Sequence, residues 1–217
     1  MDCCTTQQGT NKFFSRFSKR YGKQFRKKGL LKEQRLLIEG IAQASVTGKS
    51  ILDIGCGVGS LHFELLKKGA SKSMGVDMAE GMLDQAKTFS RDLGLEEKTE
   101  YRIGDFALLN GSVPAADITM LDKVVCCYQN VDLLVERSTE KTNEAYGLTF
   151  PHDIFPIRAF FKIQIFVGKL LRWSFHPWWH DWNQMCRRIE SSGFRESYRN
   201  NTFVWTIRVY RRENKNA

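Results

Sequence analysis

Three glycines at alternate positions, Gly55, Gly57 and Gly59, follow an apolar strand in the segment ILDIGCGVGS (51–60). Glycine lets the backbone turn tightly and approach a ligand closely, and the helix that follows points its N-terminus at that ligand. A dinucleotide-binding fingerprint reads G-x-G-x-x-G and would place its last glycine at position 60. This chain has Ser60 there, so NAD binding is disfavoured. The carboxylate of Asp53, just before the glycines, instead favours a ligand with an ammonium group.

Further acidic residues follow the next predicted strands. Asp77 lies 24 positions after Asp53 (77 − 53), and Asp105 and Asp122 follow the third and fourth strands. Ligands of open α/β sheets bind at the carboxyl ends of the strands, so we expect these acids to share one site. The residues directly after them, expected at the same edge, are Met78, Phe106 and Lys123.

A sheet must position these residues, and the pattern along the chain predicts one. Between about 46 and 150, short apolar segments alternate with helical segments, which predicts an α/β fold with a doubly wound, mostly parallel sheet. The predicted strands are 50–54, 72–76, 99–104, 117–121 and 145–149, with closing strands near 194–200 and 202–211. The predicted helices are 12–28, 30–43, 59–68, 80–93, 132–142, 154–175 and 178–192.

The glycine segment 51–60 and the acids after the later strands resemble the motifs of class I S-adenosylmethionine-dependent methyltransferases. The resemblance implies a Rossmann-like sheet of seven strands, the last one antiparallel, with S-adenosyl-L-methionine as cofactor and S-adenosyl-L-homocysteine as product. It implies that Asp77 accepts both ribose hydroxyls, that Asp105 accepts the adenine amino group, and that Asp122 lies beside the methyl-transfer centre. The expected cofactor-binding residues are Asp53, Gly55, Cys56, Gly57, Gly59, Asp77, Met78, Asp105, Phe106, Asp122 and Lys123.

The composition excludes several other classes of protein. With 217 residues, 42% of them hydrophobic, and only four prolines, the chain suits one globular domain and not a disordered or collagen-like polymer. It has no uncharged apolar run of about 18 residues and no signal-peptide layout, so we expect a cytoplasmic protein. Its six cysteines show no CxxC spacing, which favours reduced thiols, with Cys56 a small filler and no metal expected.

Positive charge is concentrated near the N-terminus. Residues 12–35 contain ten Lys or Arg and one acid, Glu33, so their net charge of +9 equals that of the whole chain. Aromatic residues recur between the cations at helical spacing, which predicts an amphipathic helix. We therefore expect a basic helical arm over 1–45, facing solvent or an anionic partner, and a cofactor-binding domain over 46–217.

The segment 154–180 contains no acidic residue and combines apolar, aromatic and basic side chains. At about 100° per residue, Arg158, Lys162, Lys169 and Arg172 form one narrow cationic stripe on a helix. A helical insertion over 154–192 is expected. Such a helix can pack into the core, lie on an anionic membrane as a peripheral contact, or wall a large apolar pocket, and the sequence leaves the three open.

From residue 128 onward the layout is similar to that of the magnesium-protoporphyrin O-methyltransferases, in which a basic N-terminal arm acts as a mobile lid. The similarity implies in-line methyl transfer to an oxygen of a hydrophobic, acidic small molecule, porphyrin-like or quinol-like. A carboxylate acceptor needs no strong base, whereas a phenol acceptor makes His152, after the fifth strand, the candidate base. Tyr21, in the arm, is the candidate to close over the cofactor.

Two alternatives remain open. Cations interleaved with Phe and Tyr in the arm also suit a nucleic-acid methyltransferase, through phosphate contacts and base stacking. The apolar segment after residue 154 favours a small hydrophobic substrate over a polynucleotide. The second alternative is a non-catalytic cofactor-binding partner at a membrane surface.

Overall fold

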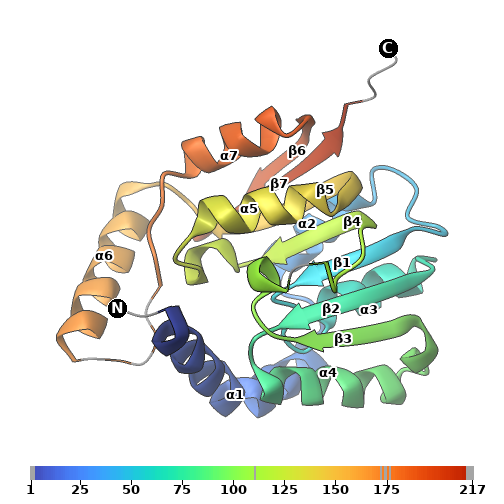
Figure 1. Cartoon of the computed structure of the whole chain (residues 1–217), viewed down its shortest axis with the longest axis horizontal. Helices are drawn as coiled ribbons and strands as arrows, with labels where there is room; N and C mark the ends of the chain where they lie inside the picture. Colours follow the sequence, from blue (N-terminus) through green and yellow to red (C-terminus); the bar gives the residue numbers. More distant parts are fainter. Residues whose placement is uncertain (1–2, 110, 172, 174, 176, 214–217) are drawn as a thin grey trace.

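The computed structural model describes residues 3–109, 111–171, 173, 175 and 177–213, and Figure 1 shows its arrangement. Over these residues the chain forms one sheet, with the strand order β3-β2-β1-β4-β5-β7-β6. The strands are β1 (Ser50–Ile54), β2 (Lys72–Asp77), β3 (Thr99–Ile103), β4 (Ala116–Asp122), β5 (Thr142–Pro151), β6 (Phe194–Asn201) and β7 (Trp205–Arg212). The helices are α1 (Cys3–Lys28), α2 (Lys32–Ile41), α3 (Ser60–Lys67), α4 (Glu80–Asp92), α5 (Val131–Glu140), α6 (Phe155–Leu170) and α7 (Trp182–Ser191), and the short 3-10 helices are η1 (Glu96–Lys98), η2 (Phe106–Leu108) and η3 (Val125–Cys127).

The sheet is parallel except for β7, which runs antiparallel to its neighbours β5 and β6. This confirms the predicted Rossmann-like sheet of seven strands with the last one antiparallel. β1 lies near the centre, where Ile51 pairs with Ser73 of β2 and Ile118 of β4. The chain moves outward from β1 to β3 and then crosses to β4, so the strand order reverses between β1 and β4. In open α/β sheets this reversal leaves a crevice at the carboxyl ends of the two strands.

Side chains alternate between the two faces of each strand, so the sheet has an apolar layer on each side. Leu52 and Ile54 of β1 pack in the layer that contains Leu134 of α5 and Ile189 of α7. Ile51 packs on the opposite side, in the layer formed with α2, α3 and α4. The helices therefore cover both faces, as the alternation of elements predicted.

Helix α2 packs into this core, although the expected arm included it. Leu37 and Ile41 are fully buried, and a Cβ added to Gly147 of β5 would lie 2.9 Å from Leu37 Cδ1. Arg211 of β7 donates hydrogen bonds to the carbonyl oxygens of Gly40 (3.4 Å) and Ile41 (2.5 Å) at the end of the helix. The part of the arm that lies outside the core is α1, and the boundary at residue 45 stays a prediction.

Helix α1 begins at Cys3, earlier than the predicted start at residue 12, and runs along α4. Ser15 Oγ accepts a hydrogen bond from the backbone N–H of Gly81 (3.1 Å), and Arg26 forms an ion pair with Asp92 (3.0 Å). Helix α6 ends at Leu170, before the predicted end at residue 175, and lies at the edge of the molecule in Figure 1. Within the described residues, no helix is both long enough and apolar enough to cross a membrane.

Candidate active site

The loop between β1 and α3 needs its three glycines. Gly55, Gly57 and Gly59 have φ angles of 65°, 54° and 86°, in the left-handed region that side chains with a Cβ disfavour. A Cβ on Gly55 would lie 2.4 Å from Val124 Cγ2, whereas a Cβ on Gly57 would have no neighbour within 4 Å. The backbone at Gly57 therefore borders open space, which a ligand can approach closely.

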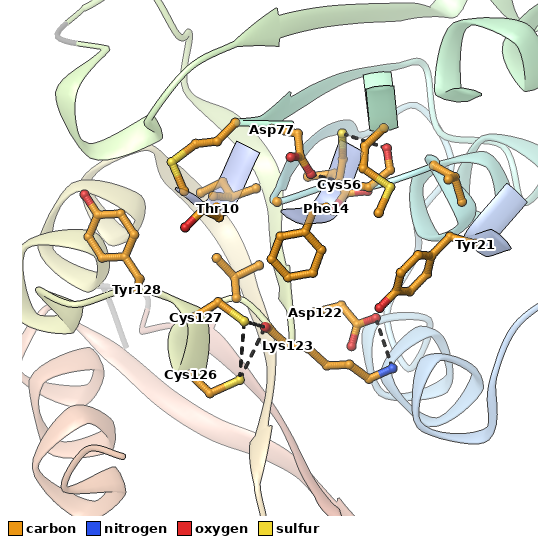
Figure 2. A pocket seen from close by; sticks show the side chains of 18 of the residues that line it. Thr10, Phe14, Tyr21, Cys56, Asp77, Asp122, Lys123, Cys126, Cys127 and Tyr128 are labelled. Atoms are coloured by element: carbon orange, nitrogen blue, oxygen red, sulfur yellow. Dashed lines mark hydrogen bonds and ion pairs between the residues drawn. The ribbon is translucent and has the colours of Figure 1, made fainter. Parts of the chain in front are cut away.

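That open space belongs to a cavity of about 420 Å³ at the carboxyl ends of β1 to β4 (Figure 2). All the predicted cofactor residues except Gly59 line it, and so does Tyr21. A Cβ on Gly59 would meet the side chains of Phe63 and His62, so this glycine serves the packing of the loop on α3. The fold thus brings together at one edge residues that are up to about 100 positions apart in the sequence.

Asp77, at the end of β2, holds the glycine loop and keeps both carboxylate oxygens engaged. Oδ2 accepts the backbone N–H of Gly57 and Oδ1 accepts that of Ala79, both at 2.8 Å. Each oxygen has a second lone pair, so the carboxylate can accept two more hydrogen bonds, such as those from the two hydroxyls of a vicinal diol. Burial raises the pKa of Asp77 to about 6.

Asp53 is 1% exposed and pairs with a residue that the motif analysis did not identify. His62 Nδ1 lies 2.8 Å from Asp53 Oδ2, and His62 Nε2 lies 3.2 Å from Tyr101 Oη. Burial raises the pKa of Asp53 above its ordinary value, and His62 opposes that rise. The row Asp53–His62–Tyr101 therefore orients a buried carboxylate at the cavity wall.

Asp105, after β3, is oriented by a tyrosine from the segment after β4. Tyr128 Oη lies 2.8 Å from both carboxylate oxygens of Asp105, and Oδ1 also accepts the backbone N–H of Ala107 at 3.0 Å. Phe106 is buried beside it and lines the cavity together with Met78. An acid and two apolar side chains therefore lie together at this part of the cavity wall.

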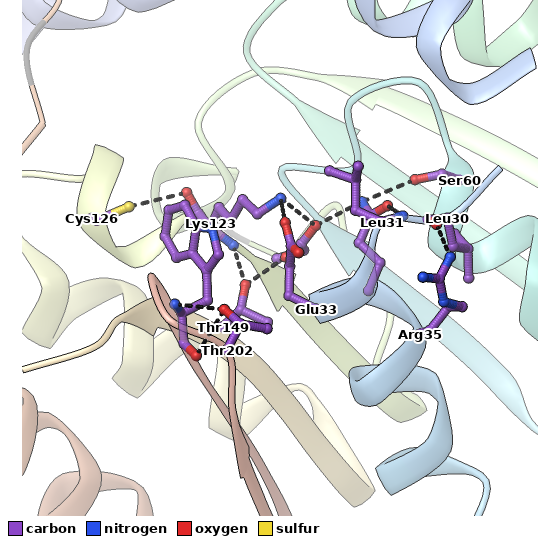
Figure 3. Close-up of polar contacts among 12 residues, drawn as sticks. Leu30, Leu31, Glu33, Arg35, Ser60, Lys123, Cys126, Thr149 and Thr202 are labelled. Carbon is purple, nitrogen blue, oxygen red and sulfur yellow. Dashed lines mark hydrogen bonds and ion pairs between the residues drawn. The ribbon is translucent and has the colours of Figure 1, made fainter. Parts of the chain in front are cut away.

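Lys123 occupies an unusual position after β4. Its φ of 61° is left-handed, which costs a non-glycine residue about 1–2 kcal/mol. Its backbone N–H donates to Thr149 Oγ1 (2.7 Å), and its ammonium group lies 2.6 Å from a Glu33 carboxylate oxygen (Figure 3). Burial alone would lower the pKa of Lys123, but the carboxylates of Asp122 and Glu33 raise it, so the ammonium group stays charged.

Helix α2 supplies a second contact to this corner. Gln34 Nε2 donates to Asp122 Oδ2 at 2.8 Å, while Thr149 Oγ1 donates to Asp122 Oδ1 at 2.5 Å. Glu33 and Gln34 of α2 thus contact Lys123 and Asp122 at the end of β4, so the helix and the strand fix each other's position. No motif at 33–34 indicated this, because the contact forms only when α2 packs across the sheet.

Aromatic side chains cover the cavity from two distant parts of the chain. Phe13 and Phe14 of α1 lie with ring centroids 4.9 and 5.0 Å from that of Phe175, which follows α6. Tyr21 is 44% exposed and reaches the corner of Asp122 and Lys123 (Figure 2). Burial raises the pKa of Tyr21, so its phenol stays protonated at neutral pH and can donate a hydrogen bond.

The remaining predicted residues have other surroundings. His152 is not among the residues that line the cavity; its backbone N–H donates to the Val204 carbonyl (2.7 Å). Its role as a base stays a prediction.

Burial raises the pKa of Cys56 well above its ordinary value, so the thiol stays protonated. In the part of the chain that the structure describes, no group of three His, Cys, Asp or Glu side chains is placed to hold a metal ion. Arg172 of the predicted stripe lies outside the described residues.

Comparisons with known proteins agree with this geometry. A family model described as a methyltransferase domain matches residues 51–146. The ubiquinone biosynthesis O-methyltransferase of Coxiella burnetii (strain Dugway 5J108-111) is 37% identical over 76 residues, 35% of this chain and 31% of that protein. The ribosomal protein L11 methyltransferase of Deinococcus radiodurans is 31% identical over 74 residues, 34% of this chain and 27% of that protein. The matches thus span about a third or less of these relatives.

Two solved structures are similar over most of the chain. Magnesium protoporphyrin IX methyltransferase from Synechocystis PCC 6803, solved with bound SAH, has a TM-score of 0.68 at 20% identity and covers 89% of this chain and 85% of its own. The putative methyltransferase in complex with the Haloferax volcanii Trm112 methyltransferase activator has a TM-score of 0.71 at 12% identity, covering 96% and 99%. At these identities the likeness concerns the fold.

The chain therefore has the class I methyltransferase fold, and residues 51–146 match a model of the methyltransferase domain. This confirms the resemblance seen in the motifs of 51–60 and of the acids after the later strands.

Proposed function

We propose that this chain transfers a methyl group from S-adenosylmethionine to an oxygen of a hydrophobic, acidic small molecule. The observation that carries the proposal is the cavity itself, which runs from the acids at the strand ends to an aromatic cover and has the charged ammonium group of Lys123 at its wall. The acids suit a polar, cationic cofactor, and the aromatic cover suits an apolar acceptor.

The residues fit the cofactor by what each can accept. Asp77 has acceptor capacity for the two ribose hydroxyls, and Gly57 leaves open the space beside them. Asp53, held by His62, faces the ammonium group, while Met78 and Phe106 enclose the adenine. When bound, the cofactor supplies an electrophilic methyl group on a sulfonium sulfur. The protein's contribution is then to orient the two reactants in line and to exclude water.

Lys123 and Tyr21 are polar groups that line the same cavity as the aromatic cover, and both favour an oxygen acceptor. A charged ammonium and a protonated phenol can donate hydrogen bonds to a carboxylate or phenolate acceptor. Neither group can act as the base that removes the proton of a neutral phenol acceptor. A carboxylate is already ionised at neutral pH and needs no base. The acceptor class that these groups suit best is therefore a carboxylate on a hydrophobic body, such as a porphyrin.

The test combines cofactor binding with methyl transfer. Asp77→Ala should weaken S-adenosylhomocysteine binding at least about 100-fold, because two hydrogen bonds to a charged group, each worth about 1.5–3 kcal/mol, are lost. Asp84→Ala, which removes an exposed acid of α4, is the matched control and should bind normally. Calorimetry measures both, and circular dichroism checks that both variants fold. Unchanged affinity in Asp77→Ala would show that the ribose does not bind there.

A nucleic-acid acceptor is the second candidate, and the exposed cations of α1 favour it. Of the eight Lys and Arg residues from 12 to 28, Arg26 forms an ion pair in the described structure. Methyl transfer from labelled cofactor to a porphyrin carboxylate, a quinol precursor and RNA, assayed side by side, separates the two candidates. Labelling of RNA alone, with binding that weakens steeply as salt rises, would favour the nucleic-acid reading.

A further inference from the structure

Helix α6 presents a row of large apolar side chains to solvent. Five residues, called here the α6 face, are 61–83% exposed: Phe155, Phe160, Ile163, Phe166 and Leu170. Scattered exposed apolar residues are ordinary, but a contiguous apolar surface on one helix marks an interaction site. The helix stands at the edge of the molecule in Figure 1, apart from the sheet.

The opposite side of α6 is anchored, so this face cannot turn inward. Ile157 and Phe161 are each 6% exposed and belong to the apolar layer that contains α5 and α7. The Phe161 ring also contacts Trp179 and Trp205, with centroids 5.6 and 6.5 Å away. The α6 face is therefore directed outward by the packing of the helix.

Cations lie along one edge of this face. At about 100° per residue, the α6 face spans an arc of about 140°, and Arg158, Lys162 and Lys169 occupy an adjoining arc of about 40°. Arg158 forms an ion pair with Asp153 (2.6 Å), whereas the exposed Lys162 and Lys169 have no acidic partner among the described residues. An apolar face bordered by cations is the arrangement of a helix that lies in the plane of a membrane interface.

From these observations we propose that the α6 face docks on the surface of an anionic lipid bilayer, with the apolar side chains in the headgroup–acyl boundary and Lys162 and Lys169 at lipid phosphates. A second copy of the chain is a poorer occupant, because residues 154–180 contain no acid. A two-fold interface there would bring the cations of one copy against those of the other.

The position of α6 connects this docking to the cavity. Phe161 and Gln164, on its inner side, line the cavity. Beyond its end, Trp173 is 50% exposed and borders a second depression together with Arg16 of α1. A docked α6 therefore holds the cover of the cavity at the bilayer, where a hydrophobic acceptor concentrates. This last step rests on the proposed function, whereas the docking itself does not.

Vesicle flotation tests the docking without any activity assay. The full chain should bind phosphatidylcholine–phosphatidylglycerol vesicles at least about tenfold more strongly than phosphatidylcholine vesicles, and release as salt screens the attraction over about 10 Å at 0.1 M. The double variant Ile163→Glu/Phe166→Glu should lose at least about tenfold in binding. Phe203→Glu, which changes a phenylalanine that is 70% exposed near β7, is the control and should bind like the wild type.

A second pair of substitutions separates charge from apolar contact. Lys162→Gln/Lys169→Gln should weaken binding to the anionic vesicles several-fold and leave the weak binding to neutral vesicles unchanged. S-adenosylhomocysteine affinity, unchanged in both double variants, checks the fold. Equal binding to both vesicle types, undiminished binding by the Glu variant, or no binding to either would overturn the proposal. So would a dimer, seen by sedimentation velocity, that the Glu variant abolishes, since the face would then be covered by a second copy.

Discussion

The cofactor end of the cavity and its cover are built in different ways. At the cofactor end, the acids and glycines sit where β1, β2, β3 and β4 end, and hydrogen bonds hold the acids: Asp53 to His62, Asp77 to Gly57, and Asp105 to Tyr128. At the cover, α1 and the segment after α6 meet through aromatic rings, with Phe13 and Phe14 against Phe175. Hydrogen bonds specify direction, whereas ring contacts permit sliding. The strand-end side of the cavity is therefore fixed by directional contacts, while the contact between α1 and the segment after α6 is fixed by ring packing alone.

Of the variants that compare the two regions, the one at the cofactor end should have the greatest effect. Gly57→Ala places a methyl group in the open space of the cavity, and overpacking of about 1–3 kcal/mol predicts a loss of cofactor affinity of about 10- to 100-fold. Gly94→Ala is a matched control, because Gly94 also has a left-handed φ (65°) and also has no neighbour within 4 Å of an added Cβ. Both variants should lose similar stability, measured by thermal unfolding. If both bind S-adenosylhomocysteine equally well, the cavity at Gly57 is not the cofactor site.

A smaller effect is expected at the cover. Phe175→Ala removes the ring that α1 packs against, so we expect the KM for the acceptor to rise about 5- to 10-fold, as for the loss of one partly buried aromatic contact. The affinity for S-adenosylhomocysteine should stay within about twofold, because the hydrogen-bonded end is untouched. Phe203→Ala, at an exposed phenylalanine outside the cavity lining, is the control. An equal loss of cofactor and acceptor binding in Phe175→Ala would contradict a separation between the two regions.

The smallest effect comes from pH. The pKa of Asp77 is raised to about 6 by burial. Above pH 6 the carboxylate is ionised and available to the proposed ribose hydroxyls, and below pH 6 the bound proton removes part of this acceptor capacity. Cofactor affinity should therefore fall about twofold at pH 6 relative to neutral pH. Calorimetric titrations across this range should show the fall in the wild type, and Asp77→Ala should lack it.

The ionisation of Asp77 also affects the stability of the ligand-free protein, and here the effect of rising pH is the opposite of its effect on cofactor affinity. The folded-state pKa of Asp77 lies above the ordinary value of 3.8, so between these two values the native state binds a proton that the unfolded state releases. The contribution of Asp77 to stability therefore decreases as pH rises through this window. A thermal midpoint that falls from pH 4 to 6, less so in Asp77→Ala, checks this sign.

The sequence predicted one half of this comparison better than the other. The glycine loop and the acids at 77, 105 and 122 were predictable because each lies at or directly after a strand end, and all of them except Gly59 line one cavity. Their partners were not. His62 lies within an apolar helix, and Tyr128 lies in a segment without a motif, so nothing local marked either residue as a neighbour of a carboxylate. Glu33 and Gln34 looked like part of a basic arm, yet they bond to Lys123 and Asp122.

The parallel sheet and the line of glycines and acids at its edge were predictable from the residues, because strand alternation, turn-forming glycines and strand-end positions are local properties of the chain. The direction of the closing antiparallel strand was instead implied by the family resemblance. Only the tertiary structure decided that α2 enters the core, that α1 meets Phe175 over the cavity, and that α6 turns one apolar side inward and leaves the other exposed. The physical reason is that an amphipathic helix records which residues share a face, while the choice of what that face packs against depends on the surfaces that the rest of the fold leaves free.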